Sequence, residues 1–113
     1  MRDTISGVFA ALADRTRRGI YEQLLDSTNG RTATELSEKA VISRQAIVKH
    51  LQVLAKSGLV SSRRDGREVR YFVTTNGTID ASSWMVNRAE AWDRRIAKLE
   101  DQTRATSRRR KSS

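Results

Sequence analysis

The sequence contains no cysteine and no proline, and it has only one histidine. Without cysteine there is no disulfide, no thiolate metal site and no cysteine-based redox switch. A lone histidine makes a poor metal site. The chain also has no Ser/His/Asp grouping, no carboxylate pair suited to a pocket and no glycine-rich phosphate loop. These absences predict a protein that is not an enzyme and that uses no metal and no cofactor.

Long apolar segments are missing as well. No run approaches the ~20 apolar residues that span a bilayer, and the N-terminus lacks the pattern of a secretory signal. We therefore expect no membrane partner and a cytoplasmic location. The 113 residues, 37% of them hydrophobic, suffice for one small domain, which would gain from further burial in a dimer.

The charge is strongly one-sided. Lys and Arg number 22 against 13 Asp and Glu, which gives a net charge of +9 and favours a polyanionic partner. Five of the positive charges lie in 104–111, a segment with no acidic and no large apolar residue. Its composition predicts a disordered basic tail over 103–113. The rest, 1–102, is expected to form one domain that keeps a charge of +4.

Helical periodicity dominates the first half of the chain. Apolar spacing predicts one helix around 5–12 and a second that begins after the N-cap Asp14 and ends within 27–30. Thr32 and Glu35 have the spacing of a capping box, which predicts a short helix to about residue 40. The arginines that follow Asp14 suit either phosphate contact or simple solvation.

A tight connection at 41–42 leads to a predicted helix from Ser43 to Leu54. A short helix, a tight turn and a helix of this length form a helix-turn-helix, whose second helix reads a major groove. Gln45 suits adenine, Arg44 suits guanine and Ala46 suits a thymine methyl. Ser43, Lys49 and His50 suit phosphate, and packing at the helix edge is the alternative for the last two. The candidate recognition residues are Ser43, Arg44, Gln45, Ala46, Lys49 and His50.

Two strands follow Gly58. They are joined by the turn pair Asp65-Gly66, which predicts a β-hairpin with a return strand over 67–74. Arginines cluster around the turn, and a thin arginine-rich hairpin suits the DNA backbone or a minor groove. The candidate contacts are Arg63, Arg64, Arg67 and Arg70. Exposure without DNA contact is the alternative for this group.

The segment from about 80 to 101 predicts one long helix. Its apolar residues follow a 4-3-4-3 spacing that is close to a coiled-coil seam. They are Met85, Ala89, Trp92, Ile96 and Leu99. The tryptophans also suit stacking on an aromatic effector or on bases, but the helical spacing favours a core or a dimer seam.

Several of these segments resemble the ArsR-type winged-helix regulators. They are FAALADRTRR (9–18), SRQAIVKHLQVL (43–54), GLV (58–60) and GREVRY (66–71), and the resemblance covers about residues 5–75. It implies a mainly α fold with a small β-hairpin, a winged helix-turn-helix that dimerises through its first and last helices. The long helix is similar to that of a branch without the metal-thiolate box.

The resemblance also implies a homodimer that binds an imperfect palindrome near promoters and usually represses transcription. The implied dimer interface comprises Ile5, Val8, Phe9, Met85, Ala89, Trp92, Ile96 and Leu99. Many relatives release DNA on binding a metal, but this chain lacks the cysteines, so its effector stays unassigned. The alternative function is a winged-helix protein-interaction module with incidental DNA binding, against which the concentration of arginine in the hairpin argues.

Overall fold

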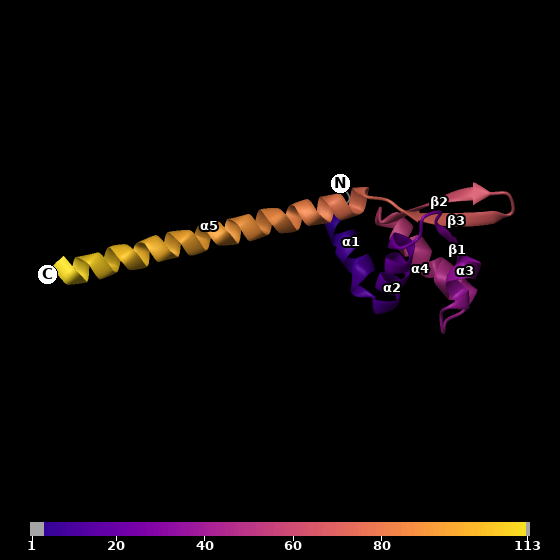
Figure 1. The fold of residues 1–113 in the computed structure, drawn as a ribbon, viewed down its shortest axis with the longest axis horizontal. Helices are drawn as coiled ribbons and strands as arrows, with labels where there is room; N and C mark the ends of the chain where they lie inside the picture. Colours follow the sequence, from indigo (N-terminus) through magenta and orange to yellow (C-terminus); the bar gives the residue numbers. More distant parts are fainter. Residues whose placement is uncertain (1–3, 113) are drawn as a thin grey trace. The chain divides into compact units, whose positions relative to one another are not determined.

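The computed structural model describes residues 4–112 and divides into two units, Met1–Ala81 and Ser82–Ser113. Figure 1 shows helices α1–α4 gathered beside the β2–β3 hairpin in the first unit. The elements are α1 (Thr4–Ala13), α2 (Arg15–Leu25), β1 (Arg31–Thr32), α3 (Ala33–Glu38), α4 (Arg44–Lys56), β2 (Val60–Asp65), β3 (Glu68–Val73) and α5 (Asn76–Ser112). The expectation of a mainly helical winged helix-turn-helix is confirmed.

Three helices begin at the capping residues that the sequence predicts. The Asp14 carboxylate accepts from the Arg17 backbone N–H (3.0 Å) at the start of α2. At the start of α3, the Thr32 hydroxyl and the Glu35 carboxylate complete a capping box. Ser43 caps α4 by accepting from the Ala46 N–H (3.2 Å). Each cap satisfies an N–H that the helix itself leaves unpaired.

The sheet is antiparallel, with strand order β1-β3-β2. In the hairpin Asp65 pairs with Glu68, so the two loop residues are Gly66 and Arg67, one position later than the expected turn pair. Gly66 has φ +64°, which matches the glycine-first turn that suits strand twist. Strand β1 was not predicted, because two residues are too few to show an alternating pattern.

The core of the first unit is centred on α4, against which α1, α2, α3 and the start of β2 pack. Leu36, Ile47, Leu51, Leu54 and Leu59 are almost completely buried there. Each such side chain contributes about 1.5–3 kcal/mol by leaving water. The helix-turn-helix is therefore held by its own apolar residues, and the opposite side of α4 is left for contacts with a partner.

Helix α5 differs from expectation at both ends. The helix was expected to begin at about residue 80, but Asn76 and Gly77 form its first turn, and it continues through the expected tail to Ser112. No glycine or proline follows Gly77. Arg104 also pairs with Glu100 (3.8 Å) and Asp101 (3.7 Å) one turn earlier, which favours helix. The boundary between units likewise falls after Ala81 rather than after residue 102.

Within residues 4–112, no helix has the combination of length and apolar content that crossing a membrane requires.

Candidate nucleic-acid interface

One face of α4 is polar and exposed along its whole length. Gln45, Lys49, Gln52 and Lys56 recur at intervals of four and three residues, opposite the buried side chains of the same helix. The first two were expected to contact DNA. Gln52 and Lys56 were not among the predicted contacts, although their helical spacing from Gln45 places them on the same face. The face offers amide groups for bases and ammonium groups for phosphates.

The N-terminus of α4 is held against α3. The Arg44 Nε donates to the Thr34 hydroxyl (3.1 Å), and the guanidinium stays exposed. Ser43 is exposed beside it and uses its oxygen as the helix cap, while Ala46 is half-buried. The structure therefore brings Ser43 and Arg44 together at one end of the face. The Thr34 hydroxyl orients the arginine and, being neutral, does not compensate its charge.

His50 lies on a different flank of α4, the one that faces the start of α2. It is half-buried, and its charge contributes to the low pKa of the Asp14 carboxyl. The main cause of that lowered pKa is the hydrogen bond from the Arg17 backbone N–H, and the Arg17 and His50 charges add to it. Packing at the helix edge, the alternative considered for His50, fits this position.

The hairpin, here called the wing (60–73), carries three exposed arginines: Arg63, Arg64 and Arg67. The Arg63 guanidinium lies over the Phe72 ring, 4.8 Å from its centroid. Such a cation–π contact restricts the side chain while its N–H groups stay available to an anion.

Arg70 does not share this exposure. Its side chain is only 25% exposed and lies among three carboxylates, those of Glu35, Asp65 and Glu68. The structure thus separates Arg70 from the other three wing arginines, with which the sequence grouped it.

A hollow of about 430 Å³ lies between the helix-turn-helix and the wing. Arg44 and Val48 line it from α4, Thr34 from α3, and Arg67 and Val69 from the wing. The two arginines are thus contributed by its two sides. Glu68 of the wing also lines the hollow, so the two arginines leave its lining with a net positive charge, which suits an anionic group such as a backbone phosphate.

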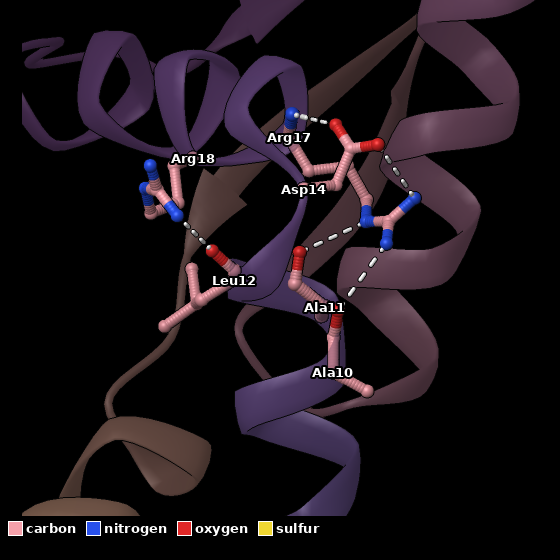
Figure 2. A network of polar contacts seen from close by, with 6 residues as sticks. All are labelled: Ala10, Ala11, Leu12, Asp14, Arg17 and Arg18. Atoms are coloured by element: carbon pink, nitrogen blue, oxygen red, sulfur yellow. Dashed lines mark hydrogen bonds and ion pairs between the residues drawn. The ribbon is translucent and has the colours of Figure 1, made fainter.

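Two of the three arginines after Asp14, Arg17 and Arg18, have a local structural role. Arg17 donates to the Ala11 (2.9 Å) and Ala10 (3.3 Å) carbonyls, and Arg18 donates to the Leu12 carbonyl (2.9 Å), as Figure 2 shows. These carbonyls lie in the last turn of α1, where the helix leaves its acceptors unpaired. The two side chains join α1 to α2, a role that the sequence did not predict beside phosphate contact and solvation.

The residues expected at a dimer interface lie in both units and differ in burial. Within the first unit, Phe9 is exposed, Ile5 is half-buried and Val8, at 1% exposure, belongs to the core. Val8 is therefore not available to a partner, because helical spacing alone does not distinguish a core residue from an interface residue. Within the second unit, all five expected residues are exposed: Met85, Ala89, Trp92, Ile96 and Leu99.

Comparisons with known proteins agree on one family. A model described as "Helix-turn-helix domain" matches residues 12–63. The transcriptional repressor SdpR of Bacillus subtilis (strain 168) is 32% identical over 83 residues, which cover 74% of this chain and 90% of the repressor. A probable mercury resistance operon repressor of Streptomyces lividans is 42% identical over 71 residues, 63% of this chain and 55% of that protein.

The fold has a solved counterpart in an ArsR-like transcriptional regulator from Rhodococcus sp. RHA1. The two chains are 36% identical and superpose with a TM-score of 0.76, over 87% of this chain and 91% of the other.

Proposed function

The chain belongs to the ArsR-type family of winged helix-turn-helix transcriptional regulators, and on this premise we propose that it is a repressor that binds double-stranded DNA of defined sequence as a homodimer. The observation that supports this most is the exposed polar face of α4, with Arg67 of the wing across a hollow from Arg44 in its first turn. The family is one of regulators, and we propose no catalytic activity.

Base reading and backbone binding fall to different residues in this proposal. Gln45 lies in the first turn of α4, the part of a recognition helix that reaches base edges, and its amide suits the two-bond contact with adenine. Arg44 suits guanine or a phosphate at the edge of the hollow. Lys49 and the exposed wing arginines bind phosphates, which fixes the register but carries no sequence information.

The homodimer is proposed to form through the apolar row of α5, with Phe9 and Ile5 of α1 contributing. The row repeats every three or four residues over four turns, the pattern of helices that pack in pairs. Trp92 is 61% exposed in the single chain, and burial of such large side chains supplies the association energy. A two-fold dimer predicts a palindromic site with half-sites about one helical turn apart.

The inducing signal is proposed not to be a thiophilic metal. One relative is named for a mercury resistance operon, but soft metals of this kind are held by thiolates. This chain has no cysteine, and the described residues contain no group of three His, Asp or Glu side chains suited to a metal.

Selection of bound fragments from a pool of randomised duplex DNA tests the function directly. We expect an enriched two-fold-symmetric sequence, bound with much higher affinity than the unselected pool. The variant Gln45→Ala should keep binding duplex DNA but relax the preference at one base pair of each half-site, by about 1–3 kcal/mol. Gln52→Ala is the matched comparison, since it removes the same amide from the same face two turns beyond the first turn; a preference that relaxes in Gln45→Ala alone assigns base reading to the first turn.

A protein-interaction module would give a different result. If the purified dimer retards no duplex at moderate salt and the selection enriches nothing, DNA binding is not the function of the fold in this chain. If Gln45→Ala leaves the preference unchanged while DNA is still bound, the reading surface lies elsewhere.

A further inference from the structure

The sequence predicts that four wing arginines contact DNA, and the structure surrounds one of them, Arg70, with acidic groups. We propose that Arg70 is a positioning residue, which holds the wing at a fixed place relative to the helix-turn-helix and does not itself contact DNA. The inference rests on the proposed function, since it names the residue that sets the spacing between the two DNA-contacting elements.

The guanidinium of Arg70 connects two parts of the fold. One terminal nitrogen lies 3.4 Å from a Glu35 carboxylate oxygen in α3. The Nε lies 3.6 Å from an Asp65 oxygen in β2, and the other terminal nitrogen lies 3.9 Å from a Glu68 oxygen in β3. All three nitrogens thus face carboxylates, one from the helix-turn-helix and two from the wing. A planar fork with several donors suits such a junction better than a single ammonium group does.

Backbone contacts meet at the same place. Strand β1 links the helix-turn-helix to the wing through only two residues, and in this pairing Thr32 lies opposite Arg70. Thr32 is also the N-cap of α3, and its N–H donates (3.4 Å) to the same Glu35 oxygen that faces Arg70. One carboxylate therefore serves the helix cap and the wing contact together, which fixes the Arg70 side chain relative to the start of α3.

The local charge opposes a DNA contact at this position. Arg63 lies opposite Arg70 in the strand pairing, and three carboxylates against these two guanidiniums still leave the site negative, so an approaching phosphate would meet a net repulsion over a few ångströms. Arg67, two residues after Asp65 in the turn, is exposed and lines the hollow from the wing, whereas Arg44 lines it from α4. The two arginines are close in sequence, yet only Arg67 is placed to bind a phosphate.

The salt dependence of DNA binding separates positioning from phosphate contact. Each phosphate contact that is removed lowers the slope of log K against log [salt] by about 0.9. We compare Arg70→Met, which keeps the alkyl stem, with Arg67→Met, using a duplex that the wild-type protein selects. We expect Arg67→Met to lower the slope by about one per half-site. Arg70→Met should weaken binding roughly tenfold, which corresponds to about 1.4 kcal/mol, and leave the slope unchanged.

Glu35→Gln is the matched variant on the other side of the junction. Glutamine keeps the capping box, because its side-chain oxygen still accepts from the Thr32 N–H, but it removes the charge that faces Arg70. We expect Glu35→Gln to reproduce the effect of Arg70→Met on affinity, although a neutral residue has replaced an acidic one near DNA. A phosphate contact by Arg70 predicts the opposite, a gain in affinity for Glu35→Gln.

Amide hydrogen exchange on the free protein gives a readout that does not depend on DNA. Both variants should exchange faster across the Asp65–Glu68 turn, with the exchange of α4 unchanged. A slope that falls by about one in Arg70→Met, or an affinity and a turn exchange equal to wild type, overturns the proposal. Failure of the proposed function is distinct, because the wild-type protein would then select no duplex at all.

Discussion

Gly77, in the first turn of α5, lies against the C-terminal end of the reading helix. Its N–H donates to the Gly58 carbonyl (3.1 Å), which also accepts from the Thr74 hydroxyl (2.7 Å). A Cβ added at Gly77 would lie 2.9 Å from the Ser57 carbonyl oxygen and 3.0 Å from that of Gly58. Even the close carbon–oxygen contacts of proteins lie at about 3.3–3.6 Å. Both obstructing atoms are backbone, so the start of α5 must move away from α4.

The variant Gly77→Ala sets two effects of opposite sign against each other. Replacing a helical glycine by alanine gains about 0.8–1.0 kcal/mol in a helix interior, and less in a first turn. Overpacking a tight site costs about 1–3 kcal/mol. We therefore expect a net loss of roughly 1 kcal/mol in the free energy of unfolding, which for a domain of this size lowers Tm by about 4–8 °C.

The chain supplies its own controls. Gly7 in α1 and Gly19 in α2 are also helical, and an added Cβ meets no atom within 4 Å at either position. Only the propensity effect remains there, so Gly7→Ala and Gly19→Ala should each stabilise by up to about 1 kcal/mol. Urea denaturation followed by circular dichroism measures all three variants. If Gly77→Ala is stabilised as much as its controls, the close approach of α5 to the end of α4 is refuted.

Two further predictions concern acid stability and assembly. The folded-state pKa of Asp14 is lowered below its ordinary value of 3.8, chiefly by the hydrogen bond from the Arg17 N–H, so the ionised carboxylate stabilises the fold above pH 3.8 and this contribution is lost as the pH falls through the folded pKa. Asp14→Asn keeps the cap but does not titrate, so it should flatten the acid part of a plot of urea midpoint against pH. An unchanged plot would contradict the assignment. Trp92→Arg should convert the proposed dimer to a monomer in sedimentation and weaken DNA binding roughly 10²-fold. Arg94→Ala, on the other side of α5, should change neither the assembly nor the affinity. If Trp92→Arg is still a dimer, α5 does not form the interface.

The caps show which features of this fold can be predicted from the sequence. Asp14, Thr32 with Glu35, and Ser43 act on N–H groups no more than three residues away, so the residue types and spacing were sufficient to predict them. The buried row of α4 was predictable for the same reason, since its period is that of the helix. Most of the fold could therefore be predicted from local hydrogen bonds and from the helical period of the apolar residues.

The features that the sequence did not reveal depend on contacts between distant segments. Arg70 stands among similar arginines near a turn, and only the pairing of β1 with β3 brings Glu35 to it across about a third of the described chain. Val8 has the spacing of an interface residue, and only the packing of α1 assigns it to the core. In both cases the residue type was compatible with two environments, and the tertiary structure selected one.

The same reasoning changes what the net charge of +9 means. Five of its charges lie beyond residue 103, Arg17 and Arg18 are committed to carbonyls of α1, and Arg70 lies among carboxylates. The exposed cations of the candidate interface are therefore a smaller set: Arg44, Lys49, Lys56, Arg63, Arg64 and Arg67. Because all of them lie on α4 or the wing, the case for a polyanionic partner depends on where the charges lie, and it would stand even for a chain whose total charge was near zero.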